Sequence, residues 1–188
     1  MPESLNGKPY EIADLAFTDY DFIKKITIPE GAVTRIACAA FSGCNGLTEV
    51  TVPRGIELEN SIFSKCENLE KATVYSPLGT FMFENCKNLR EVIIADDVAY
   101  IDSYAFRGCT ALTEITIPFA ADYVGNGAFQ DCNNLEKVTF ANPDGWKRTT
   151  DYISYEYRAA KGERFNVDSP MENAKTVLRD GNDWNYFK

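Results

Sequence analysis

The chain has 188 residues and a net charge of −9 at neutral pH. This acidic balance argues against nucleic acid or an anionic membrane surface as the partner, and no apolar run approaches the roughly 18 residues that would span a bilayer. Apolar residues make up 45% and charged residues 25% of the sequence, which is ordinary for one folded domain or one short repeat array. The start of the sequence, MPESLNGKP, has no apolar segment of signal-peptide type, so a cytoplasmic protein and a mature exported fragment both stay open.

From residue 12 onward one motif recurs six times. The first copy, residues 12–29, is disguised because Tyr20 stands where later copies have cysteine, and the third copy has Ala72 where others have valine or isoleucine. Residues 101–118 spell the motif most fully, as I-x-x-x-A-F-x-x-C-x-x-L-x-x-I-x-I-P. The anchoring phenylalanine recurs in steps of 24, 22, 20, 23 and 23 residues, at Phe17, Phe41, Phe63, Phe83, Phe106 and Phe129. Such a period predicts a solenoid, in which each unit buries its apolar face against its neighbours.

Each copy combines two local signals. The segment L-x-x-V-x-I alternates apolar and polar residues, which predicts a half-buried strand, and a proline often ends it. The segment A-F-x-x-C-x-x-L has apolar residues three apart, which predicts a short turn of α or 3₁₀ helix. We therefore expect one strand and one short helical turn in every coil.

The motif resembles the BspA-like class of leucine-rich repeats over residues 12–141. The resemblance implies an α/β solenoid, a right-handed coil with one short parallel strand and one helical turn per repeat. The third and fourth copies depart from it, because residues 59–63 and 79–83 lack the alanine before phenylalanine. With the short 20-residue step between them, this predicts an irregular coil around residues 75–82.

The period fails after residue 141, where the turn cluster Asn-Pro-Asp-Gly at 142–145 marks a boundary. We divide the chain into a six-coil solenoid, residues 1–141, and a C-terminal cap, residues 142–188, that packs on the last coil. Residues 152–157 alternate like an edge strand, and Ser169 begins a predicted helix that ends near residue 180. The segment has too few apolar residues for a core of its own, so it is not expected to be an independent domain.

Six cysteines raise the questions of metal and disulfide. Five occupy one slot of the repeat and predict a column inside the coil: Cys44, Cys66, Cys86, Cys109 and Cys132. There is no C-x₂-C pair and no histidine, so the usual zinc spacings are missing. Parallel side chains would strain a disulfide, and we expect free thiols that fill the core. Cys38 lies outside the column and is expected to be more exposed.

The sequence predicts no catalytic residue, metal or cofactor. The lack of histidine removes Ser–His and Cys–His catalysis. The adjacent carboxylates Asp96 and Asp97 follow a strand and indicate a solvated turn, and residues 180–183 lack the register of a calcium loop.

The outward positions of the strands supply the candidate binding residues. One outward slot holds threonine in every copy but the fourth, where Ile93 replaces it, and Tyr75 replaces the proline of other copies. A second slot holds a charged residue in each copy. We interpret Tyr75 and Ile93 as the centre of an interface; the alternative is that a loop of the short copy covers them. The proposed surround is Lys71, Thr73, Glu91, Glu114 and Thr116.

The resemblance also implies a function. BspA-like proteins suggest a non-catalytic protein-binding or adhesion module on the surface of a bacterium or released from it. Its partner would be a protein, such as a host matrix or cell-surface protein, or a glycan, with neither nucleic acid bound nor a membrane inserted. Two alternatives stay open: a carbohydrate- or peptide-processing enzyme that uses surface carboxylates, and a cytoplasmic interaction scaffold.

Overall fold

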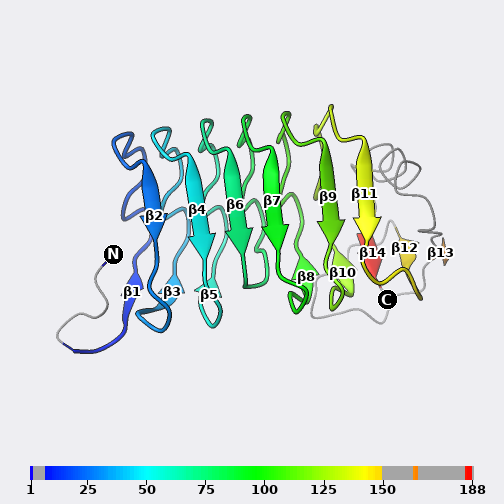
Figure 1. Ribbon diagram of the computed structural model, residues 1–188, viewed down its shortest axis with the longest axis horizontal. Coiled ribbons are helices and arrows are strands. Elements are labelled where there is room, and N and C mark those ends of the chain that lie inside the picture. The colour runs from blue at the N-terminus through cyan, green and yellow to red at the C-terminus, as the bar shows by residue number, and fades with distance from the viewer. Residues whose placement is uncertain (2–6, 150–162, 165–184, 188) are drawn as a thin grey trace.

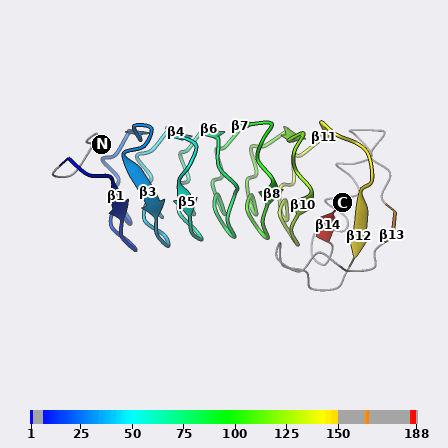
Figure 2. The same ribbon diagram turned by 90° about the horizontal axis from the view of Figure 1, so that it is seen from below.

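The computed structural model describes residues 1, 7–149, 163–164 and 185–187. The repeats form stacked coils of a single parallel β-solenoid, which runs from one end of the array to the other without crossing back (Figure 1). Two rows of strands follow the array, a row of longer strands on one side and a row of shorter strands on another (Figure 2). The predicted solenoid is confirmed.

The longer strands form what we call the strand face. One strand per coil belongs to it: β2 (Lys25–Thr27), β4 (Glu49–Val52), β6 (Lys71–Val74), β7 (Glu91–Ile94), β9 (Glu114–Ile117) and β11 (Lys137–Phe140). Residues one repeat apart lie side by side, so Thr27, Thr51, Thr73 and Ile93 are aligned across four strands. The ladder consists of two pieces, β2-β4-β6-β7 and β9-β11, and no ladder joins β7 to β9 within the described strands.

The shorter strands form a second row behind the first. They are β1 (Tyr10–Ile12), β3 (Val33–Ile36), β5 (Glu57–Leu58), β8 (Tyr100–Ile101) and β10 (Tyr123–Val124). The sheet β1-β3-β5 is separate from the pair β8-β10. The fourth coil contributes only one isolated bridge here, Leu78 to Ile101. The expected irregularity around residues 75–82 is therefore present, because the short repeat leaves too little chain for a strand.

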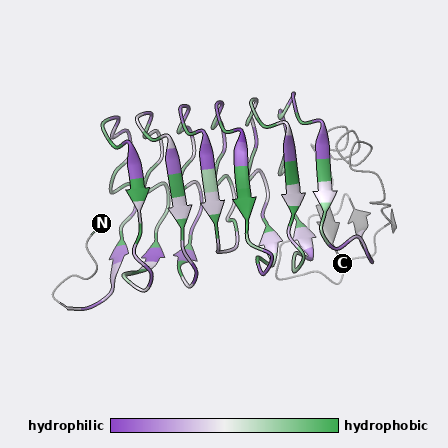
Figure 3. Cartoon of the chain, in the orientation of Figure 1, coloured by the Kyte–Doolittle hydropathy of each residue, from purple (hydrophilic) through white to green (hydrophobic). Residues whose placement is uncertain are grey.

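The core consists of columns of identical side chains. The six anchoring phenylalanines stack ring on ring, with centroids 5.1–5.6 Å apart and planes within 13° of parallel. All are buried except Phe17, which ends the stack and is half-buried. Offset stacking of this kind adds to the stability gained from burial. Hydropathy alternates along the strands of the strand face, with polar residues outward, except in β7, where three apolar residues follow Glu91 (Figure 3).

The five column cysteines are free and buried, as expected. Their role as apolar fillers is only part of the account, because each thiol also donates a hydrogen bond. Every acceptor is the carbonyl of the anchoring phenylalanine one coil earlier, at 3.0–3.2 Å, as in the bond from Cys86 Sγ to Phe63 O. The column therefore links successive coils as well as filling them.

The prediction of a helical turn in each repeat is wrong. The A-F-x-x-C segments are series of tight turns, and the described residues contain no helix. The residues two before and two after the phenylalanine take positive φ, as Ala39 (53°) and Gly43 (71°) do around Phe41. A left-handed residue at every fourth position interrupts a right-handed helix. The backbone N–H groups of these residues bond to the next coil instead, for example Ala39 N to Asn60 O at 3.0 Å.

The described part of the C-terminal segment adds three short strands. They are β12 (Lys147–Thr149), β13 (Glu163–Arg164) and β14 (Asn185–Phe187). Strand β14 runs antiparallel to both β10 and β12. Trp146 packs edge-on against Phe140, with ring centroids 4.8 Å apart, and its indole N–H donates to Asn142 O. The strand predicted at 152–157 and the helix predicted from Ser169 lie outside the described residues, so the cap stays a prediction.

Candidate binding surface

The strand face offers a row of hydroxyl groups to solvent. The outward threonines are exposed or half-buried, and they are Thr27, Thr51, Thr73, Thr116 and Thr139. Threonine is favoured in strands because its branched side chain packs well on a pleated surface. This row explains how the face stays in water, but hydroxyl groups alone select no particular partner.

A row of charged residues runs beside the threonines, and its members pair with one another. Lys25 bonds to Glu49 at 2.9 Å, Lys137 to Glu114 at 3.1 Å, and Lys71 to Glu91. The hydrogen bond from Lys25 lowers the pKa of the Glu49 carboxyl. Similarly, the Glu91 carboxylate raises the pKa of Lys71. These charges are therefore largely neutralised within the protein.

Tyr75 is open to solvent, with 38% of its surface exposed. The Arg54 guanidinium lies over its ring, 5.4 Å from the centroid, and pairs with Asp97. A shallow pocket of about 160 Å³ adjoins the ring and is lined by Glu30, Thr51, Pro53, Arg54 and Tyr75. All of these neighbours except Asp97 come from the first half of the array, so the Tyr75 ring lies on the N-terminal half of the strand face.

Ile93 is also open to solvent, with 46% of its surface exposed. No loop within the described part of the chain covers Tyr75 or Ile93, so the alternative in which the short repeat hides them is wrong. Ile93 does not line the pocket beside Tyr75. It lies instead on β7, at the interruption of the ladder. Sequence reasoning missed other large exposed side chains, among them Phe119, 60% exposed in the turn after β9, and Phe22, 76% exposed in the first coil.

The residues predicted to surround the patch fall into two groups. Lys71 and Glu91 line a polar cleft of about 230 Å³ at the start of the strands, and Thr73 is aligned with Ile93. Glu114 and Thr116 lie on β9, across the interruption, and their partners in the ladder are Lys137 and Thr139. The structure therefore places the predicted site residues on one face without joining them into one pocket.

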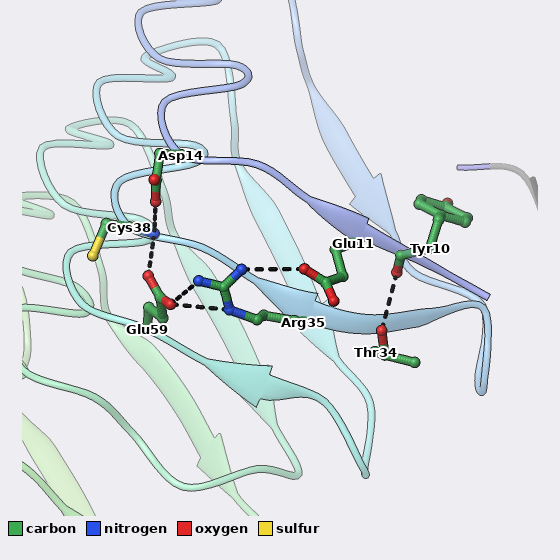
Figure 4. A network of polar contacts seen from close by, with 7 residues as sticks. All are labelled: Tyr10, Glu11, Asp14, Thr34, Arg35, Cys38 and Glu59. Atoms are coloured by element: carbon green, nitrogen blue, oxygen red, sulfur yellow. Dashed lines mark hydrogen bonds and ion pairs between the residues drawn. The ribbon is translucent and has the colours of Figure 1, made fainter.

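A polar network that the sequence did not reveal joins the first three coils on the second row of strands (Figure 4). Arg35 donates from Nη1 to Glu11 Oε2 at 3.1 Å, and its Nε and Nη2 both donate to Glu59 Oε1. The backbone N–H of Cys38 donates to Asp14 Oδ1 at 3.0 Å and to Glu59 Oε2 at 2.9 Å. The repeat spacing of residues 11, 35 and 59 is the signal that could have found the ion pairs.

Three side chains of this network have atoms that can ligate a metal ion. Asp14, Cys38 and Glu59 bring one such atom each to within 4.8 Å of one another. Hydrogen bonding to Cys38 and to Arg35 lowers the pKa of Glu59, while the Glu59 carboxylate raises the pKa of the Cys38 thiol. A cation would need the thiolate, which this arrangement disfavours, and would displace Arg35. The geometry supports a polar clamp between coils.

Comparisons with known proteins agree with this architecture. The sequence matches the family model described as "BspA type Leucine rich repeat region (6 copies)" at residues 10–136 and 77–157. The chain belongs to the BspA-type leucine-rich-repeat family. No curated protein matches the sequence. Within the described residues, no helix is long and apolar enough to cross a membrane.

Solved structures of bacterial leucine-rich-repeat proteins share the fold of this BspA-type chain. A leucine-rich cell surface protein from Faecalibacterium prausnitzii is 28% identical, with a TM-score of 0.63 over 85% of this chain and 43% of that one. A leucine-rich repeat protein from Bacteroides ovatus is 26% identical, with a TM-score of 0.56 over 69% and 40%. A T. pallidum leucine-rich repeat protein, 22% identical with a TM-score of 0.50 over 72% and 76%, shows the fold alone.

The chain spans less than half the length of the first two of these structures. Solenoids of stacked repeats present extended surfaces that bind other proteins. Membership of this repeat family accordingly favours a protein-interaction module over an enzyme.

Proposed function

We propose that this chain is a non-catalytic protein-binding module that attaches a bacterium, or a protein it releases, to a partner protein. The strand face is the binding surface, and Tyr75 and Ile93 lie in its contact area. The observation that carries the proposal is the exposure of these two large side chains on a face whose other outward positions are threonine and paired charge.

Residues of the strand face differ in how much free energy they gain from contact with a partner. Threonines and neutralised ion pairs hydrate easily and gain little from contact with a partner. An exposed tyrosine and isoleucine gain free energy when water leaves them, at roughly 25 cal/mol for each Å² of apolar surface. Tyrosine is enriched at the energetic centre of protein interfaces, where a polar rim surrounds it. Lys71, Glu91 and Glu114 provide a rim of this kind.

Display on the cell surface is part of the same proposal. It is supported by the name of the Faecalibacterium prausnitzii protein, a leucine-rich cell surface protein that is 28% identical over most of this chain. Brief protease treatment of intact producing cells, followed by mass spectrometry, tests it. Peptides of this chain should be released from unbroken cells, and their appearance only after lysis would contradict surface display.

The binding test replaces the two exposed side chains together. The double variant Tyr75→Ser and Ile93→Thr restores the threonine row, and we expect it to lose most attachment to host matrix proteins or cells. The matched control is Leu15→Ser, which removes a similarly exposed apolar side chain outside the strand face. Full attachment by a double variant with unchanged melting temperature would rule out this contact area.

A further inference from the structure

The turns that follow β2 and β4 hold opposite charges at corresponding positions. After β2, the N–H of Ala32 donates to Pro29 O at 3.2 Å and closes a tight turn with Glu30 and Gly31 at its centre. Gly31 has a φ of 73°, the left-handed conformation that is common at the third position of a turn. Arg54 takes the place of Glu30 in the next coil, again before a left-handed glycine. The two turns therefore place a carboxylate and a guanidinium on adjacent coils.

The Arg54 guanidinium does not pair with the carboxylate of the adjacent coil. It pairs with Asp97, two coils further along, and lies over the Tyr75 ring of the coil between, 5.4 Å from the ring centroid. Other ion pairs of the strand face, such as that of Lys25 with Glu49, join adjacent coils. The positive charge of Arg54 is thus already neutralised by the more distant carboxylate.

Glu30 is left without a charged partner. Within the part of the chain that the structure describes, its exposed carboxylate makes no ion pair and no hydrogen bond. It lines the shallow pocket of about 160 Å³ beside Tyr75, together with Thr51, Pro53 and Arg54. The pocket therefore contains one uncompensated negative charge.

The backbone holds the walls of this pocket in place. The N–H of Tyr75 donates to Val52 O at 3.0 Å, and the hydroxyl of the buried Ser76 donates to Pro53 O at 2.9 Å. Thr51 belongs to β4, which is hydrogen-bonded to a strand on either side, β2 and β6 (Figure 1). The ring, the proline and the threonine hydroxyl are thus positioned before any partner binds, as in most binding pockets.

This combination of groups suits a basic side chain. A lysine or arginine covers apolar surface with its aliphatic stem while its charged end contacts polar groups. The Tyr75 ring and Pro53 provide the apolar surface. The Glu30 carboxylate provides the opposite charge, and the Thr51 hydroxyl can accept a hydrogen bond. An acidic side chain would instead be repelled by Glu30 and would find the guanidinium of Arg54 already paired.

We propose that the pocket beside Tyr75 receives a lysine or arginine side chain of the partner protein, with its charged end paired to Glu30. This inference rests on the proposed function and adds the chemistry of the partner at the same contact area. The net charge of −9 on the chain acts in the same direction, because complementary charge steers two proteins together.

The experiment uses the whole chain and two short peptide probes. One is a blocked peptide with a single lysine between glycines, and its matched control has norleucine, which keeps the aliphatic stem without the charge. In NMR titrations of the isotope-labelled chain we expect the lysine peptide to bind about fivefold more tightly, as one exposed ion pair allows. The amide signals of Thr51 and Tyr75 should shift, while that of Thr139, at the far end of the strand face, stays unchanged.

Two variants separate the pocket from general electrostatics. Glu30→Gln removes the charge and keeps the shape of the side chain, and we expect it to abolish the preference for the lysine peptide. The matched control is Glu57→Gln, which removes another exposed carboxylate, on β5 of the second row of strands. Both variants have the same net charge, so a general attraction of the lysine peptide would weaken equally in the two. We expect the preference to remain in Glu57→Gln.

Each outcome decides the inference. Equal binding of the two peptides, no binding of either, a preference that survives Glu30→Gln, or an equal loss in Glu57→Gln would overturn it. If the preference is absent while cell attachment still depends on Tyr75 and Ile93, the proposed function stands without this use of the pocket. If the preference holds while attachment does not depend on those two residues, the proposed function falls and the pocket remains a site for a basic side chain.

Discussion

The two sides of the solenoid respond differently to the same junction between the fourth and fifth coils. On the aromatic side, Phe83 and Phe106 stack 5.5 Å apart, and the Cys109 thiol donates to Phe83 O, as at every other junction. On the strand face, the ladder stops between β7 and β9. The difference indicates that the buried side-chain columns hold two coils together even where the strands beside them do not pair.

The strongest test of this difference between the two sides is to remove a ring from the aromatic column. We expect Phe106→Ala to lower the free energy of unfolding by about 3–5 kcal/mol, because the ring is fully buried between two others. Removing the terminal ring by Phe17→Ala should cost clearly less, since that side chain is only half-buried. Urea denaturation of both variants measures the difference, and equal losses would mean that the column does not carry the stability.

The column of buried thiols predicts that the free energy of unfolding falls at alkaline pH. Burial raises the pKa of Cys66 to about 12, against an ordinary thiol pKa of about 8.5. The native thiol therefore keeps its proton while the unfolded one ionises. The contribution of the protonated Cys66 thiol to the free energy of unfolding is complete below about pH 8.5. This contribution is lost as the pH rises towards 12, at about 1.4 kcal/mol for each pH unit.

Comparison of variants isolates this effect from other groups that titrate in the same range. Urea melts between pH 8 and about 11 should give a shallower fall in stability for Cys66→Ala than for the parent chain. Cys38→Ser, at the half-exposed thiol outside the column, should change the fall less than Cys66→Ala does, because the hydrogen bond with Glu59 raises the pKa of Cys38 without full burial. Identical slopes for all three proteins would show that the column thiols do not titrate differently in the two states.

The interruption between β7 and β9 can be probed by the same valine-to-alanine change on two strands. Val50→Ala removes a fully buried side chain of β4 and should cost about 2 kcal/mol. Val92→Ala removes the corresponding side chain of β7, which is half-buried at the interruption, and should cost about half as much. Guanidinium melts of the pair test this, and a larger loss for Val92 would mean that β7 is closed in solution.

The smallest effect is expected from the surface charges. Lys71→Ala removes an exposed ion pair with Glu91 and should change the free energy of unfolding by no more than about 1 kcal/mol. Thermal melts at low and high salt measure it. A loss of several kcal/mol would contradict the view that the charged row shapes the face without holding the solenoid together.

Much of the fold could be predicted from the sequence, because repetition makes weak local signals reinforce one another. The phenylalanine and cysteine columns, the strands and the irregular fourth coil all follow from the spacing of like residues. The helical turn was predicted wrongly because the apolar spacing fits a helix while the flanking residues do not. Gly43, Gly108 and Asn85 take positive φ two residues after phenylalanine, and residue types that tolerate this conformation were the overlooked signal.

The candidate site was predictable in its exposure but not in its arrangement. The exposure of Tyr75 and Ile93 follows from the alternation of the strands, and their role in binding stays a prediction. The interruption beside Ile93 depends on a non-local relation, the backbone pairing of β7 with β9, which lie one repeat apart. The alternation of residues within either strand does not contain that information.

The bonds between coils also bear on how such a chain can grow. In the turns around the phenylalanines each coil supplies N–H groups to the coil that follows it, and the following coil returns a thiol to the phenylalanine carbonyl. A duplication of one whole repeat inserts a complete set of donors and acceptors, so the flanking units meet the same chemistry as before. A gain of a single residue within the turns would instead misalign every bond on both sides. Genetic change by whole repeats is thus the tolerated route, and each new copy brings one more outward slot that can vary.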